Sequence, residues 1–135
     1  MDIVTIIVAI AGLFGAALGA GALVSPGWAA KFVRMQADPA QPDGYAEFRA
    51  TFGGVFLALH VALLVALFTG FGFIGASAML CAGWAGAAGG RVLSLLLDGS
   101  KGVRTRHNYV SIIVEVVMAI VFALPVYNFI QTMPG

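Results

Sequence analysis

The sequence predicts an all-α fold, a four-transmembrane-helix bundle with a short interfacial helix after the first span. Hydrophobic residues make up 61% of the 135 residues, and the mean hydropathy is +1.00. Charged residues make up 10%, against about 25% in an average soluble domain. The charges gather in clusters separated by long uncharged stretches. Because this number of charges is too small to cover the surface of a globule of this size, we expect most of the surface to face lipid.

Length and composition also exclude several classes of protein. At about 100–200 residues per domain, residues 1–135 are expected to form a single integral membrane domain. The chain is too apolar for intrinsic disorder, and its single cysteine excludes a disulfide scaffold. A net charge of +1 without a basic stripe excludes nucleic acid as a partner.

The first predicted span covers residues 3–24, which carry no charge. About 20 apolar residues cross a bilayer core of about 30 Å. Since the extreme N-terminus has Asp2 and no basic residue, we interpret this segment as a retained span rather than a secretion signal. Ser25-Pro26 then predicts a helix start. Apolar side chains and cations follow at helical spacing on opposite sides, typical of a helix in the membrane interface: Trp28, Phe32 and Met35 against Lys31 and Arg34.

The other three spans are predicted over residues 50–68, 73–97 and 109–130. The uncharged stretch 50–90 would be about 60 Å long as one helix, so it must fold back, and the glycines of residues 69–72 allow the turn. Backbone groups in lipid must pair within their own segment, so each span is expected to be a helix. Pro125 is expected to kink the last one.

The basic residues predict the orientation. In a four-span chain the first and third connections lie on the same side, and every Lys or Arg except Arg91 lies in or beside them. The positive-inside rule places that side in the cytoplasm and both termini on the non-cytoplasmic side.

Two charges fall inside predicted spans. Arg91 precedes the end of the third span by six residues and Glu115 follows the start of the fourth by six, so both lie about 9 Å inside the same boundary. An unpaired charge in mid-membrane costs about 2.5–3.5 kcal/mol or more. The sequence therefore predicts a salt bridge between Arg91 and Glu115.

The sequence predicts one polar layer in the cytoplasmic half of the membrane, formed by Glu47, Arg49, Arg91, Asp98 and Glu115. Ser94 and Asp98 continue the face of Arg91, and Arg49 begins the second span at the level of Asp98, whereas Glu47 is expected to point away from Arg49. The candidate site residues are Glu47, Arg49, His60, Arg91, Ser94, Asp98 and Glu115. Two interpretations remain open: a site for a headgroup, an ion or a proton, or a satisfied network that fixes helix register.

Two smaller patterns accompany the polar residues. His60 is interpreted as a hydrogen-bonded core histidine or a proton relay, and because no second histidine or cysteine accompanies it we expect no metal site. Gly15-x-x-x-Gly19 and Gly86-x-x-x-Gly90 predict close helix packing, within the bundle or across a homodimer.

The residues 47–54 (EFRATFGG), the residues 90–99 (GRVLSLLLDG) and Glu115 resemble the pattern of one protein family. It is a family of small four-helix bacterial membrane proteins known only as a domain of unknown function. The resemblance implies the four-helix fold and the bacterial cytoplasmic (inner) membrane, and it includes most of the candidate polar residues. It implies no activity.

No catalytic set is recognisable, so whether the protein is an enzyme stays open. We expect a non-enzymatic protein that binds a lipid- or quinone-like molecule or is an accessory subunit of a larger membrane complex. The alternative is a small homodimeric transporter or channel that uses the Arg/Glu/Asp layer, and the third is a membrane enzyme with Glu115 or Glu47 as general acid or base. The expected partners are membrane lipids, other membrane subunits or a second copy, and no cofactor is expected beyond a bound lipid or quinone.

Overall fold

The computed structural model describes residues 2–36, 38–41 and 43–133, and within these ranges every regular element is helical. Four helical segments are long and apolar enough to cross a membrane: Ile3–Val24, Gly44–Thr69, Phe73–Leu97 and Arg106–Gln131. The predicted all-α fold with four spans is therefore confirmed. A short helix, α2 (Pro26–Val33), follows the first span, with Ser25 at its N-cap and Pro26 in its first turn.

Two spans begin earlier than the sequence predicts. α1 (Ile3–Val24) and α5 (Phe73–Leu97) have the expected bounds. The second span begins at Gly44 rather than residue 50 and consists of α3 (Gly44–Glu47), η1 (Phe48–Val55) and α4 (Phe56–Thr69). The fourth, α6 (Arg106–Gln131), begins three residues early. Charged and polar residues can extend a helix beyond the hydrocarbon core, so the apolar stretch marks the membrane crossing and not the helix end.

The chain divides into two compact units. One unit joins the start of α1, up to Val8, to α5, α6 and the short turn η2 (Gly99–Lys101) between them. The other runs from Ala9 to Phe71 and contains the rest of α1 with α2, α3, η1 and α4. The expectation of a single domain over residues 1–135 stays a prediction.

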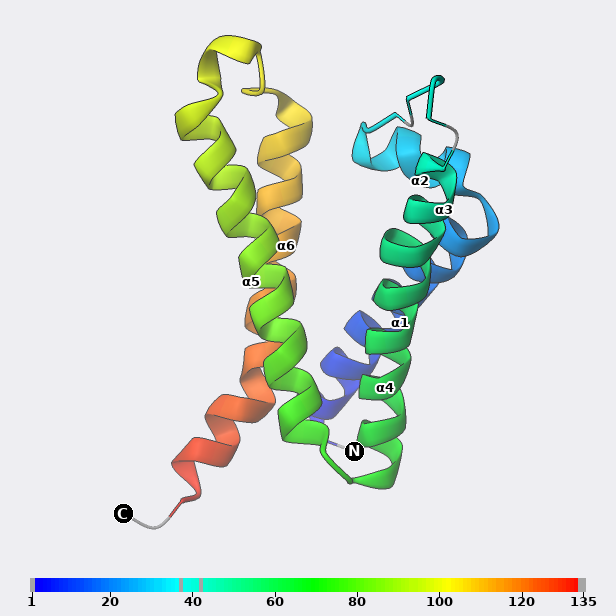
Figure 1. The fold of residues 1–135 in the computed structure, drawn as a ribbon. Helices are drawn as coiled ribbons and strands as arrows, with labels where there is room; N and C mark the ends of the chain where they lie inside the picture. Colours follow the sequence, from blue (N-terminus) through cyan, green and yellow to red (C-terminus); the bar gives the residue numbers. More distant parts are fainter. Residues whose placement is uncertain (1, 37, 42, 134–135) are drawn as a thin grey trace. The chain divides into compact units, whose positions relative to one another are not determined.

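Within the second unit, α1 and α4 lie side by side and pack through glycines (Figure 1). A Cβ atom added at Gly19 would lie 2.5 Å from the backbone nitrogen of Leu57, and one at Gly53 would lie 2.8 Å from the Cα of Leu23. Only hydrogen atoms fit between the backbones at these points. The predicted close approach through Gly15-x-x-x-Gly19 is thus present.

Within the first unit, α5 and α6 form an antiparallel hairpin (Figure 1). Each helix buries a single stripe at helical spacing, consisting of Ser77, Leu80, Trp84 and Ala88 on α5 and Glu115, Met118, Ala119, Phe122 and Pro125 on α6. α6 continues through Pro125, and its C-terminal part bends away from α5. A proline removes one helix hydrogen bond, and its ring crowds the preceding turn.

The turns are built on glycines. Gly70 and Gly72, on either side of Phe71, have φ angles of 74° and 73°, and Gly102, which ends η2, has a φ of 77°. These are left-handed conformations that glycine adopts without steric cost. The helix thus breaks at residues 70–72, between α4 and α5, and the reversal of direction there stays a prediction.

Candidate functional site

The predicted salt bridge between Arg91 and Glu115 is present at the α5–α6 interface. The Nε of Arg91 donates to Oε1 of Glu115 at 2.7 Å, and the side chains are 30% and 9% exposed. Arg91 follows Ala88 by one turn and so continues the buried stripe of α5, while Glu115 begins the stripe of α6. The two charges lie in the contact face because only there can they pair away from lipid.

Asn108 extends this cluster. Its Oδ1 accepts from Nη1 of Arg91 at 3.1 Å, and its Nδ2 donates to the carbonyl of Val103 at 2.6 Å. Sequence reasoning missed this residue. Its position seven residues before Glu115, two turns along the same face, is the signal that could have found it.

The cluster is not fully satisfied. Oε2 of Glu115 is buried and has no hydrogen-bond partner in the described part of the chain. A buried polar atom without a partner costs about 1–3 kcal/mol, and more when it is charged. On the other side of the pair, Nη2 of Arg91 has no protein acceptor among the described residues. Glu115 thus has an acceptor, and Arg91 a donor, that no described residue satisfies, and a hydroxyl and a carbonyl or phosphate oxygen are the groups that would complement them.

Ser94 and Asp98 belong to a second network at the end of the same hairpin. Oγ of Ser94 donates to Asp98 at 3.1 Å, and Nζ of Lys101 donates to the other carboxylate oxygen of Asp98 at 2.8 Å. Arg104 contacts the carbonyl of Leu95, which is one of the last carbonyls of α5, at 3.4 Å. These hydrogen bonds join the end of α5 to the turn that follows it.

Acidification is expected to weaken this turn through Asp98. The hydrogen bonds from Lys101 and Ser94 lower the pKa of Asp98 below its ordinary 3.8. The carboxylate therefore contributes stability above pH 3.8 that is lost as the pH falls through the lower pKa of the folded state. We expect Asp98→Asn to lower the melting temperature slightly at pH 7 and to approach the wild type as the pH falls through the lowered pKa of Asp98, measured by circular dichroism in detergent. Lys101→Gln should give the same pH profile, and a constant difference at all pH values would contradict this assignment.

Arg49 lies in the other unit and contacts the end of α1. Its Nη1 donates to the carbonyl of Leu23 at 2.5 Å. The last carbonyls of a helix have no partner within the helix, and a cation near that end also interacts favourably with the helix dipole. Arg49 belongs to η1, a π-helix over residues 48–55 that coincides with most of the EFRATFGG motif. The motif residues Arg49 and Gly53 both contact Leu23, so this part of the motif joins the second span to the first.

His60 is fully buried against α1. Its Nδ1 lies 2.7 Å from the carbonyl of Phe56, and its ring packs on the ring of Phe56 with centroids 4.4 Å apart. The ring also occupies the space that a side chain at Gly15 would need. These contacts match the expectation of a hydrogen-bonded core histidine. A role of His60 in proton transfer stays a prediction.

Glu47 is exposed and ends the short helix α3. The candidate residues thus form two groups: Arg91, Ser94, Asp98 and Glu115 in the hairpin, and Glu47, Arg49 and His60 in the α1–α4 unit. That both groups belong to one polar layer stays a prediction. Among the described residues, no three His, Cys, Asp or Glu side chains come together in a way that could hold a metal ion.

Comparison with known proteins gives one match. A family model described as a domain of unknown function (DUF4345) matches residues 3–125, which is nearly the whole chain. No curated protein and no solved structure matches the chain. The match covers both sequence motifs and Glu115.

Proposed function

The chain belongs to the DUF4345 family, a family of unknown function, and we propose that it binds a lipid- or quinol-like amphiphile at the α5–α6 hairpin. The polar head of this molecule lies against Glu115 and Arg91, and its tail lies along the lipid-facing surface of the hairpin. The protein itself is a small membrane protein with four apolar helices.

One observation supports this proposal above the others: Oε2 of Glu115 is buried without a partner while Oε1 is held by Arg91. A network that served only to fix helix register would gain stability from a protein donor at Oε2. A hydroxyl on the head of a ligand supplies that donor. The head therefore needs at least one hydroxyl, and an adjacent oxygen can accept from Nη2 of Arg91.

The surroundings of the pair fit an amphiphile. Exposed apolar side chains flank it on both helices, namely Val92, Leu93 and Leu96 on α5 and Val110 and Val114 on α6. Arg91 is partly exposed, so a head can approach it from the side of the lipid. The side chains that cover Oε2 of Glu115 must move before a hydroxyl can reach that oxygen. A tail of acyl or isoprenoid type would replace bilayer lipid at this surface at little cost, because one apolar contact is exchanged for another.

Purification in a mild detergent tests the proposal. We expect native mass spectrometry of the wild-type protein to show one bound small molecule with a hydroxylated head. Glu115→Gln should reduce its occupancy or affinity about tenfold or more, because a hydrogen bond to a charged group contributes about 1.5–3 kcal/mol. Glu47→Gln removes an exposed carboxylate in the other unit and should leave binding unchanged.

Two results would contradict this function. The first is a wild-type protein without any bound small molecule when it is extracted from its native membrane. The second is equal retention of the molecule by the wild type and by Glu115→Gln. Co-purification of a further membrane protein in place of a small molecule would favour the accessory-subunit alternative.

A further inference from the structure

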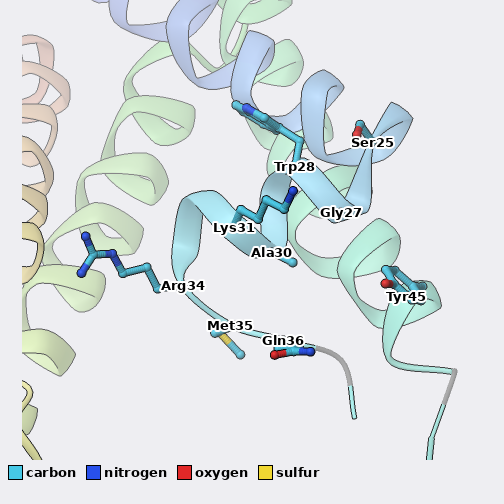
Figure 2. Close-up of a pocket in the computed structure, with 9 residues that line it drawn as sticks. All are labelled: Ser25, Gly27, Trp28, Ala30, Lys31, Arg34, Met35, Gln36 and Tyr45. Atoms are coloured by element: carbon cyan, nitrogen blue, oxygen red, sulfur yellow. The ribbon is translucent and has the colours of Figure 1, made fainter. Parts of the chain in front are cut away.

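A groove opens beside α2, in the unit that contains the first two spans. Its volume is about 850 Å³, and it is lined by residues of α2, the segment that follows it, and α3: Ser25, Gly27, Trp28, Ala30, Lys31, Arg34, Met35, Gln36 and Tyr45. Figure 2 shows the side chains of Lys31, on α2, and Arg34, at its C-terminal end, extending in opposite directions, with Tyr45 on the side toward which Lys31 extends. None of these residues contributes to the site on the hairpin.

The groove has an uncompensated positive charge. Lys31 and Arg34 are both exposed, and in the described part of the chain neither forms a salt bridge with a carboxylate. Ser25, Gln36 and Tyr45 add polar groups able to donate hydrogen bonds. The groove is therefore complementary to an anion that accepts several hydrogen bonds.

The groove also lies next to an exposed aromatic pair. The rings of Trp28 and Phe32 stack with centroids 5.4 Å apart, and they are 43% and 52% exposed. The chain reaches α2 directly from the last residue of α1, a membrane span. Because Trp and Tyr favour the headgroup level of a bilayer, the position of Trp28 and Tyr45 indicates that the groove lies at that level.

We propose that this groove binds the headgroup of an anionic phospholipid from the surrounding bilayer. The phosphodiester lies beside Lys31, and Tyr45 donates to a headgroup oxygen. Arg34 points to the other side of the end of α2 and adds to the attraction for the anion, while Trp28 and Phe32 pack on the glycerol and the first acyl carbons. A lipid is favoured over a soluble anion because the cations and the exposed aromatic pair lie on the same eight-residue helix or at its end. This site is independent of the proposed function of the hairpin, since the two share no residue.

The test uses the full-length protein in detergent, titrated with phosphatidylglycerol or phosphatidylcholine and followed by native mass spectrometry. A basic residue near an anionic lipid surface contributes about 1 kcal/mol, which corresponds to about fivefold in affinity. We expect Lys31→Gln and Arg34→Gln each to weaken phosphatidylglycerol binding about fivefold and the double variant about 25-fold. The first residue of α6, Arg106, is exposed, so Arg106→Gln is the control and should change binding less than twofold.

The outcomes separate this site from its alternatives. The proposal is supported if the groove variants lose phosphatidylglycerol binding while phosphatidylcholine binding is unchanged. Millimolar inorganic phosphate should also fail to displace the bound phosphatidylglycerol. Equal loss in Arg106→Gln would overturn it, because the lipid would then sense only the overall charge. Displacement by inorganic phosphate would also overturn it, because the groove would then bind soluble anions. If Glu115→Gln weakened phosphatidylglycerol binding and the groove variants did not, the lipid would bind at the hairpin. That result would overturn the groove site and leave the proposed function of the hairpin standing.

Discussion

Replacing Arg91 by glutamine is expected to lower the free energy of unfolding of the hairpin by about 3–5 kcal/mol. The substitution removes the cation 2.7 Å from Oε1 of Glu115 and leaves a buried carboxylate whose Oε2 has no partner among the residues that the structure describes. The glutamate must then be protonated or the helices must separate to solvate it. Equilibrium unfolding in mixed micelles of a mild detergent and sodium dodecyl sulfate measures the loss.

A double variant distinguishes the charge from the shape of the side chain. Arg91→Gln combined with Glu115→Gln has no buried charge, so it should regain most of the stability that the single variant loses. Lys101→Gln removes a cation from the exposed pair with Asp98 and should cost less than about 1 kcal/mol. If Arg91→Gln is no more destabilised than Lys101→Gln, the Arg91–Glu115 pair stabilises the hairpin no more than an exposed ion pair does.

Gly19→Ala is expected to destabilise the α1–α4 pair by about 2–3 kcal/mol. The new methyl group would lie 2.5 Å from the backbone nitrogen and 2.8 Å from the Cα of Leu57. Backbone atoms cannot move aside by a change of rotamer, so the two helices must separate and lose the contacts between them. Thermal unfolding followed by circular dichroism, in the same detergent for both proteins, measures the effect.

Gly86→Ala is the matched control for this prediction. It makes the same chemical change in the second G-x-x-x-G pattern, where an added Cβ atom meets nothing within 4 Å. Alanine is a better helix former than glycine by about 1 kcal/mol, so this variant should be neutral or slightly more stable. Equal destabilisation of both variants would mean that flexibility of glycine, rather than space, is what the fold requires.

The span bounds could be predicted where the sequence marks the helix end itself. α1 stops before Ser25-Pro26, and α5 begins after the glycine turn and stops before Asp98-Gly99. The second and fourth spans have polar first turns that look like loop from composition alone. Their helices therefore begin earlier than the apolar stretch.

The candidate site was predictable to a similar degree. Depth and opposite sign were enough to pair Arg91 with Glu115. The vacant oxygen of Glu115 was not predictable, because it depends on which donors the packed helices bring within reach. The π-helix over residues 48–55 and the contact of Arg49 with Leu23 were missed as well, since a change from i+4 to i+5 hydrogen bonding leaves no pattern in side-chain hydrophobicity.

The hydrogen bond from Arg49 to the carbonyl of Leu23 has a consequence for biosynthesis. The donor is made 26 residues after the acceptor, so the first span leaves the ribosome before this end of it can be capped. Until the second span arrives, the Leu23 carbonyl and the Arg49 guanidinium each need water as a hydrogen-bond partner. Both needs are met when the two segments enter the bilayer as a pair, which makes the first helical hairpin the natural unit of membrane insertion.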